Sequence, residues 1–523
     1  MVRTQGLLFA ALFFTAAGFY QPMDYDNTKS RFMLLSAVVD EGRLSIDSNQ
    51  EYTIDKAIVN GHYYSIKPMG LPLLSIPIYW FVRHAVLGPD IPGVVSHIMD
   101  PEARYLVRVV TVSLPFAFLG LILFQFLLSC GVPARHALWA CLAYGFGTIA
   151  LNHATIYSGH ETAAFFIFSS FSILFQISRG GASAGGRSTA LGLLAGLCAG
   201  VAVLCDYMVV IYAVIIAVYA LTSKIRGASK AAFIMGAILC AVSLAVYDQI
   251  CFGSPWSTGY SHLAFRPFQE YTSKGLFGIL WPDPRVLLAL LGSVSRGLLF
   301  ISPVLLFALA GLAFLYRRAH YRREFWVMTL IPAAALVIYS GYPGWHGGWT
   351  FGPRYLVPVL PFLVLPLALA ADGGPWFLLL LGLSVVQVAC AQLGWPHTAP
   401  EIRNPIAEFI LPLIRMGGTS LSLLGGGQPG AILGGIFQYV IAAVLSALAF
   451  QGLTRPRPRR LPRTWRFGMG AWAAYVVLAL LLVRSPDAAI VRRSRWLVLN
   501  DTALTLRSPL LQKSAMLESL KDR

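Results

Sequence analysis

The stretch GLLFAALFFTAAGFYQPMDYDNTKSRF, residues 6–32, joins a long apolar run to a cluster of charges. Its first half suits a membrane helix, since about 20 apolar residues cross a hydrocarbon core roughly 30 Å thick. Its second half places Asp24, Asp26, Lys29 and Arg31 where that helix would leave the membrane. The stretch therefore predicts a membrane protein with polar chemistry close to the membrane surface.

The composition of the whole chain agrees with this prediction. Of 523 residues, 57% are hydrophobic and only 12% are charged, whereas soluble domains carry about 25% charged residues. Long apolar segments must be helical, because no water in the bilayer satisfies their backbone groups. We therefore expect an all-α polytopic membrane protein. The net charge of +17 fits basic cytoplasmic loops and anionic lipid better than nucleic acid.

The apolar segments predict a bundle of about thirteen transmembrane helices. Their approximate bounds are 5–21, 103–129, 134–152, 160–177, 189–205, 207–223, 231–250, 297–315, 325–341, 355–371, 375–396, 431–451 and 467–484. We expect one transmembrane catalytic domain over 1–484, whose first outer loop is 22–102, and a C-terminal outer tail over 485–523. The seven cysteines show no metal-like spacing and are expected to be small core residues.

Charges in the connections orient these helices. With Arg3 in the cytoplasm, the basic connections fall on the inner face, as the positive-inside rule requires. They lie around Arg135 and in 178–188, 223–230, 316–324 and 453–466. The outer face then receives 22–102, 153–159, 253–296, 342–354, 397–430 and the tail.

The segment GLPLLSIPIYWFVRHAVLG, 70–88, also has the length of a span. Counting it as one would place the arginine-rich loops outside. We therefore interpret it as a helix that lies in the outer interface, which suits its two prolines and its Arg83 and His84.

Charged groups beside membrane helices are costly, so each outer cluster is a functional hypothesis. Asp26 and Asp24 can act as a general base towards a hydroxyl, or they can cap the helix that follows. Further along the same loop, Asp55 is another candidate base. Lys67 beside Pro68 suits contact with a phosphate, or its side chain simply reaches the lipid headgroups.

Later outer segments add candidate substrate contacts. His160 and Glu161 border a short turn with His153, and their spacing favours hydrogen bonding to substrate over a metal site. Asp206 must find a structural partner or line a cavity. The loop 253–297 offers Tyr260, His262 and Arg296, which suit a sugar or lipid chain and equally an interfacial belt.

The stretch YPGWHGGWTFGPRYLVPVLPF, 342–362, is the most distinctive of these clusters. Trp345, His346 and Trp349 alternate with glycines, which let a ligand approach the backbone closely. Arg354 can offer a two-pronged donor to a phosphate at the membrane boundary, or it can extend to the headgroups.

The order of these features resembles the GT-C fold of integral-membrane glycosyltransferases. The nearest groups are the protein O-mannosyltransferase-like enzymes and the lipid A aminoarabinose transferases, in which a short acidic motif follows the first helix and a Lys-Pro pair ends the first outer loop. DYDNTKSRF (24–32) and SIKPMG (65–70) match by position, and GWTFGPRYLVPVLP (348–361) is similar to a late Arg-Tyr-Pro feature. The layout agrees over most of 1–370.

This resemblance implies a multi-pass enzyme of the bacterial inner membrane with an extracytoplasmic site. The donor would be a sugar on a polyprenyl phosphate, and the acceptor a hydroxyl of a lipid, glycan or protein. Lys67, Arg296 and Arg354 would bind the donor phosphate. The family's adjacent Asp-Glu pair is replaced by Asp24-Tyr25-Asp26, so the base stays open, in the order of preference Asp26, Asp24 and Asp55.

A divalent metal is not required by this chemistry and stays open, because a lipid phosphate leaves more readily than a nucleotide diphosphate. The alternative function is a lipid-linked sugar flippase or polysaccharide transporter. A transporter predicts an internal repeat and polar residues at mid-membrane, and the sequence shows neither. A non-catalytic scaffold would not need the gathered Asp, Lys, His and Arg residues. No phosphate-binding loop of the ATPase type is present.

Overall fold

The computed structural model describes residues 2–20, 25–87, 101–180, 186–275, 278–371, 373–416, 418–422 and 430–453. Helices dominate these ranges, and each of the two sheets described has only two strands. Within these ranges, seven helices are long and apolar enough to cross a membrane: Ala103–Ser129, Gly159–Arg179, Gly186–Cys205, Gly227–Phe252, Ala319–Ser340, Pro375–Leu393 and Ile432–Gln451. The prediction of an all-α polytopic membrane protein is confirmed.

Shorter apolar helices complete the bundle. They are Val2–Gly18, Tyr207–Thr222, Pro303–Tyr316 and Arg354–Ala370. Each predicted span within the described residues coincides with helical structure, although 134–152 is broken at Thr148 and Ile149 and 297–315 is broken at Ser302. The predicted span 467–484 and the tail 485–523 lie outside the described residues.

In the first half of the bundle, α1 (Val2–Gly18) is followed after the first loop by α4 (Pro101–Arg108), which continues through a π-helical turn, Val109–Ser113, into α5 (Leu114–Ser129). The next helices are α6 (Ala134–Gly147), α7 (Ala150–Ala154), α8 (Gly159–Arg179), α9 (Gly186–Cys205), α10 (Val210–Thr222) and α11 (Gly227–Phe252). The second half contains α13 (Pro284–Gly292), α14 (Leu298–Ile301), α15 (Leu306–Tyr316), α16 (Arg322–Ser340), α17 (Leu360–Ala370), α18 (Pro375–Leu393), α19 (Leu411–Arg415) and α20 (Gly430–Gln451).

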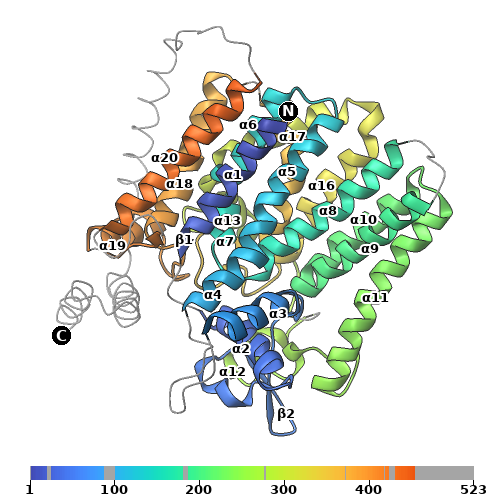
Figure 1. Ribbon diagram of the computed structural model, residues 1–523, viewed down its shortest axis with the longest axis vertical. Coiled ribbons are helices and arrows are strands. Elements are labelled where there is room, and N and C mark those ends of the chain that lie inside the picture. Colours follow the sequence, from blue (N-terminus) through green and yellow to red (C-terminus); the bar gives the residue numbers. More distant parts are fainter. Residues whose placement is uncertain are drawn as a thin grey trace.

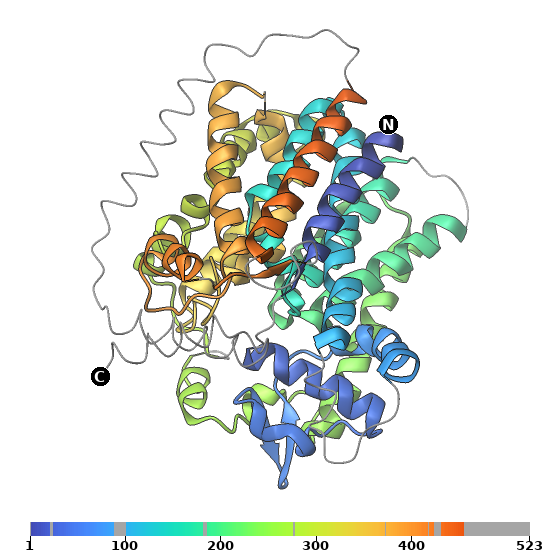
Figure 2. The same cartoon turned by 60° about the vertical axis from the view of Figure 1, so that its left-hand side comes forward.

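The two ends of the bundle differ in chemistry. At the end where α1 begins, Arg179 donates to the carbonyl oxygen of His320 (2.9 Å) and Tyr321 donates to that of Cys130 (2.9 Å). We call this the basic end, because the basic connections between α5 and α6, α8 and α9, α10 and α11, and α15 and α16 meet there. The opposite end carries the first loop, and we call it the loop end (Figures 1 and 2).

The first loop folds into a small layer on the loop end (Figure 1). It contains α2 (Asp26–Asp40), a 3-10 helix (Asp47–Tyr52), a hairpin of β2 (Lys56–Val59) and β3 (His62–Ser65), and α3 (Gly70–Val82). Its own apolar core includes Met33, Ile46, Ile66 and Met69, and it packs onto Leu204, Cys240 and Phe252 of α9 and α11. The loop is therefore a compact layer with a defined geometry.

The hairpin turn follows from its sequence. Asn60 (φ +51°) and Gly61 (φ +83°) both adopt positive φ, as the tightest hairpin turns require. The register pairs Lys56 with Ser65. Leu263 forms a bridge to Ala57 on the other edge of β2, so the later loop with α12 (Arg266–Thr272) is fastened to the first loop.

Within the segment 70–88, the described residues 70–87 form a helix at the loop end, as the charge pattern predicted. Figures 1 and 2 show α3 crossing the end of the bundle beside α2. Tyr79 donates to Asp40 (2.9 Å) and Arg83 pairs with the same carboxylate (3.2 Å). Trp80 and Phe81 are each 55% exposed, which suits rings that meet the lipid interface.

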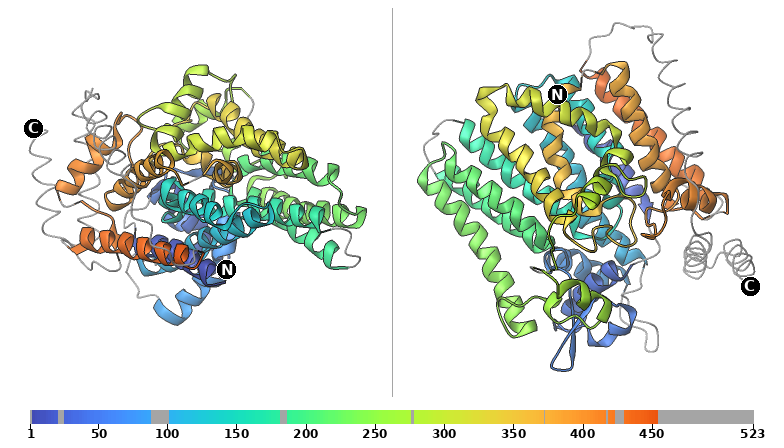
Figure 3. Two further views of the ribbon diagram at one scale, coloured as in Figure 1. Left: turned by 90° about the horizontal axis from the view of Figure 1, so that it is seen from above. Right: turned by 180° about the vertical axis from the view of Figure 1, so that it is seen from behind.

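The pair α9 and α11 forms one edge of the bundle (Figure 3). Gly192, Gly196 and Gly200 recur every fourth residue on α9 and face α11. A Cβ atom on Gly196 would lie 1.9 Å from the carbonyl oxygen of Phe233. Small residues at this spacing let membrane helices approach closely, and α11 then ends at Gly253, which adopts φ +77°.

The opposed ends predict an orientation that cysteine labelling can check. All seven native cysteines are buried or partly buried, so the background should be low. We expect a membrane-impermeant maleimide to label Ser273→Cys, at the loop end, in intact cells. Ala319→Cys, at the basic end, should react only after permeabilisation, because basic connections stay in the cytoplasm. The reverse pattern would invert the orientation.

Candidate functional site

A buried ion pair lies at the base of the first loop. The ammonium of Lys67 is 2.9 Å from Oδ2 of Asp55, and the residues are only 8% and 5% exposed. Burial on its own would lower the pKa of Lys67, but the charge and hydrogen bond of Asp55, together with Tyr260, outweigh it and raise that pKa. The ring of Tyr260 lies against the same ammonium, at 5.8 Å from its centroid.

The hairpin accounts for this pair. Asp55 precedes β2 and Lys67 follows β3, so the Asn-Gly turn brings both to the same end of the hairpin. The hydroxyl of Ser30 on α2 donates to the Asp55 carbonyl (2.6 Å) and bonds the Ser65 hydroxyl (2.7 Å). Lys67 was expected to bind a donor phosphate, whereas here its charge is held by Asp55.

A second buried pair joins α8 to the end of α9. Nδ1 of His160 is 2.7 Å from Oδ2 of Asp206. Burial would raise the pKa of Asp206, but the hydrogen bond from His160 and the charges of His160 and Arg31 hold it below its usual value. Asp206 was expected either to pair with a structural partner or to line a cavity. The structure provides the partner, His160, which is itself a candidate site residue.

Arg354 lies beside this second pair. Its guanidinium stacks 5.1 Å from the ring centroid of Tyr355 and donates to the Tyr355 hydroxyl (3.3 Å). The Tyr355 ring in turn lies 5.8 Å from that of His160. Arg354 also interacts electrostatically with Asp55. Residues from the first loop, α8, α9 and the segment after α16 thus converge in one cluster at the loop end.

Arg296 is held by backbone and hydroxyl oxygens. It is 1% exposed and donates to Gly348 (3.1 Å), to Thr350, and to the hydroxyl and carbonyl of Thr398 (3.0 and 2.9 Å). These bonds tie the loop that precedes α17 to the loop that follows α18. Arg296 was expected to bind phosphate directly, but most of its hydrogen-bonding capacity is used in this tie.

Aromatic rings connect the tied loops to the first loop. Tyr25 lies 4.1 Å from the ring of His397 and 5.9 Å from that of Trp349, and Trp395 donates to its hydroxyl (2.9 Å). Burial lowers the pKa of His397 to about 3, so this ring is neutral at physiological pH. The expected residues Trp345 and His346 are partly buried in the same loop, and Arg296 and Arg354 both act on His346 electrostatically.

Asp26 begins α2 directly after Tyr25. Its Oδ1 accepts the backbone N–H of Ile54 (2.9 Å), and its carbonyl accepts the Thr53 hydroxyl (3.1 Å). It is partly exposed. No cation within the described residues lies at ion-pair distance from Asp26, in contrast to Asp55 and Asp206.

Two expected site residues, Glu161 and His262, are not joined to this cluster. Glu161 is fully buried and accepts the hydroxyl of Tyr144 (2.5 Å) between α8 and α6. His262 bonds Ser257 (2.8 Å), and its carbonyl accepts the N–H of Ile58, so it fastens the later loop to β2. Asp24 lies outside the described residues.

The structure adds residues that the sequence did not single out as site residues. Arg31, one of the charges that follow the first helix, is buried beside Asp206. His153 lies 5.9 Å from His160, ring to ring. Tyr355 and His397 complete the cluster. The Asn-Gly sequence at 60–61 predicts a hairpin turn and could have indicated the Lys67–Asp55 pair. No local sequence pattern distinguishes Arg31.

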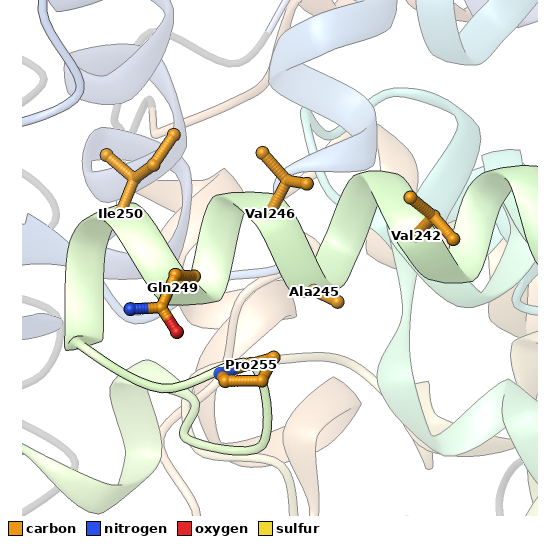
Figure 4. A pocket seen from close by; sticks show the side chains of 6 residues that line it. All are labelled: Val242, Ala245, Val246, Gln249, Ile250 and Pro255. Carbon is orange, nitrogen blue, oxygen red and sulfur yellow. The ribbon is translucent and has the colours of Figure 1, made fainter.

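Two other features are separate from the cluster. Within the described ranges no group of three or more His, Cys, Asp or Glu residues could hold a metal ion. A shallow groove on α11 is lined by Val242, Ala245, Val246, Gln249, Ile250 and Pro255 (Figure 4). Val242, Val246 and Ile250 are more than half exposed on this edge helix, which indicates a lipid-facing surface.

Comparisons with known proteins give one structural likeness. No family model matches the chain, and no curated protein matches it. Among solved structures, the chain is similar to the crystal structure of ArnT from Cupriavidus metallidurans bound to undecaprenyl phosphate, with a TM-score of 0.45 and 12% sequence identity. The match covers 98% of this chain and 77% of that chain.

The Lys67–Asp55 pair makes a stability prediction. Lys67→Met leaves a buried carboxylate without a partner, which costs about 3–5 kcal/mol of unfolding free energy. Lys67→Met combined with Asp55→Asn should cost clearly less than the sum of the single changes. The measurement is unfolding of the purified protein in mixed detergent micelles.

Lys56→Met is the matched control, since Lys56 lies on the same hairpin, donates to the carbonyl and side-chain oxygens of Gln50, lies over the Tyr63 ring, and has no carboxylate at ion-pair distance among the described residues. It should cost less than about 1 kcal/mol. Equal stability of Lys67→Met and Lys56→Met would contradict a stabilising role for the buried pair.

Proposed function

We propose that the protein is a GT-C-type glycosyltransferase. It would take a sugar from a polyprenyl phosphate and transfer it, with inversion, to a hydroxyl of a lipid, glycan or protein on the extracytoplasmic side. The observation that carries this proposal is the separation of charges at the loop end. One partly exposed, unpaired carboxylate, Asp26, neighbours a buried cluster in which cations exceed carboxylates.

Asp26 is the base in this proposal. The backbone N–H of Ile54 fixes its Oδ1, so Oδ2 can take the proton of an acceptor hydroxyl. The hydroxyl oxygen then forms a bond to the anomeric carbon while the bond from that carbon to the phosphate oxygen breaks. Because attack and departure occur on opposite faces of the sugar, the configuration inverts. Asp24 remains the alternative base.

Arg354 is the proposed phosphate contact. The leaving phosphate gains charge as the bond breaks, and a fixed cation in a partly dry site stabilises that charge. Lys67 and Arg296 support the site indirectly. Lys67 holds Asp55 in place, and Arg296 holds the 348–350 loop through its hydrogen bond to Gly348. His160, Asp206, Tyr260, Trp345, His346 and Trp349 are proposed to contact the sugar, the lipid chain or the acceptor.

A transfer assay tests the proposal. The purified protein would be offered a panel of isotopically labelled polyprenyl-phosphate sugars together with a membrane extract as the source of acceptors. We expect transfer from at least one donor, and Asp26→Asn should lower kcat by about 10²-fold or more, as expected for loss of a general base.

Asp47→Asn is the matched control. Asp47 also accepts a backbone N–H, from Tyr63 (2.7 Å), but its partner is the exposed His62 on the hairpin. It should retain full turnover. Full turnover by Asp26→Asn would remove the base assignment. Movement of the donor across vesicle membranes without any transfer would favour the flippase instead.

A further inference from the structure

The first turn of α8 is buried and has no side-chain cap. Ser158 precedes α8 without making a capping hydrogen bond, and its buried hydroxyl has no partner among the described residues. Gly159 packs so closely on α9 that a Cβ atom would lie 2.1 Å from the Cys205 carbonyl oxygen. The N–H groups of a helix start attract anions when no side chain satisfies them.

Arg31 extends from α2 to this helix start. Its Nη2 lies 3.6 Å from the position that a Cβ of Gly159 would occupy. It is 4% exposed, and Nη1 donates to the carbonyl (3.3 Å) and side-chain oxygens of Asn27. Its Nε has no hydrogen-bond partner within the described ranges. Buried donors are nearly always satisfied in folded proteins, so this one indicates a missing acceptor.

Two further groups around the same helix start have unused donors. Both ring nitrogens of His153 are buried without a partner among the described residues, and so is Nε of Arg354. The ring of His153 lies 5.9 Å from that of His160, and Arg354 is linked to His160 through Tyr355. Unsatisfied donors from α2, α7 and the segment before α17 therefore surround the first turn of α8.

The charges agree with a missing anion. Lys67 has a carboxylate partner, and the charge and hydrogen bond of Asp55, with Tyr260, raise its pKa against the effect of burial. Burial lowers the pKa of Arg31, even though Asp206 and Asp55 act in the opposite direction. Asp206 already accepts the hydrogen bond of His160. Because Asp55 pairs with Lys67, Arg31 is left with the carboxylate of Asp206, which it shares with His160, and a poorly compensated buried cation is costly.

We propose that the first turn of α8 and Arg31, with Arg354, Ser158 and His153, form the binding site for a phosphate group. The ligand that fits the proposed function is the phosphate of the lipid-linked sugar, so this inference rests on that function and specifies where the donor is held. Two guanidinium groups can donate in parallel to phosphate oxygens. Lys67 and Arg296 are then supports of this site rather than ligands.

A binding experiment tests this site without relying on turnover. The full chain in nanodiscs would be titrated with a polyprenyl phosphate, with the polyprenol of equal length, and with inorganic phosphate, and the dissociation constant measured from tryptophan fluorescence. We expect the lipid phosphate to bind more tightly than the polyprenol. Arg31→Gln should weaken the lipid phosphate roughly tenfold or more, the effect expected for loss of a charge-assisted hydrogen bond.

Arg43→Gln is the control, because Arg43 pairs with Glu41 on the surface of the same loop, and it should bind as the unchanged protein does. Should Arg31→Gln fail to fold, Arg354→Lys keeps the charge, loses the two-pronged donor and should also weaken binding of the lipid phosphate. Unchanged binding by the folded variants, or equal affinity for the polyprenol, would overturn the site.

Arg31-dependent binding of inorganic phosphate without binding of the lipid phosphate would overturn the assignment to the donor. The proposed function can fail separately. A protein that binds the lipid phosphate through Arg31 and yet transfers no sugar would refute the glycosyltransferase and leave this site in place.

Discussion

The hydrocarbon core of a bilayer solvates neither charges nor free peptide groups, and the architecture follows from that constraint. Apolar helices fill the middle, and polar chemistry is displaced to the two ends. At the basic end the charges join turns, as Arg179 does with the His320 carbonyl. At the loop end they gather between the first loop and the segments that precede α8 and α17. Segments far apart in sequence therefore meet there.

The same constraint explains what the sequence could predict. Hydropathy and loop charge are local properties, so the spans and the position of 70–87 at one end of the bundle could be predicted from the residues alone. Convergence of the Asp55, Lys67, His160, Asp206 and Arg354 segments followed from placing all outer connections on one face. The break at 148–149 was missed, because the apolar pattern continues across it.

Pairing is the property that the sequence did not reveal. Lys67 and Arg296 have the composition expected of phosphate ligands, but Asp55 holds one and the carbonyls at 348–350 and 398 hold the other. Arg31 has an ordinary sequence setting, and only its burial against Gly159 distinguishes it. The sequence around a cation in a polar stretch does not indicate whether the partner of that cation is a residue of the protein or a ligand.

Whether a charged group has its partner within the protein separates the structural residues of the cluster from its candidate functional residues. A buried ion pair whose members satisfy one another fixes geometry and has little capacity left for a ligand, as with Lys67 and Asp55 or, in part, His160 and Asp206. A group that the fold buries or orients without a partner raises the free energy of the empty site, and a ligand that supplies the partner recovers that cost as binding energy. Among the described residues, Asp26 has no cation at ion-pair distance, and Nε of Arg31 has no acceptor. The two occur on one turn and a half of α2, so a single short helix would present both the proton acceptor and the anion contact.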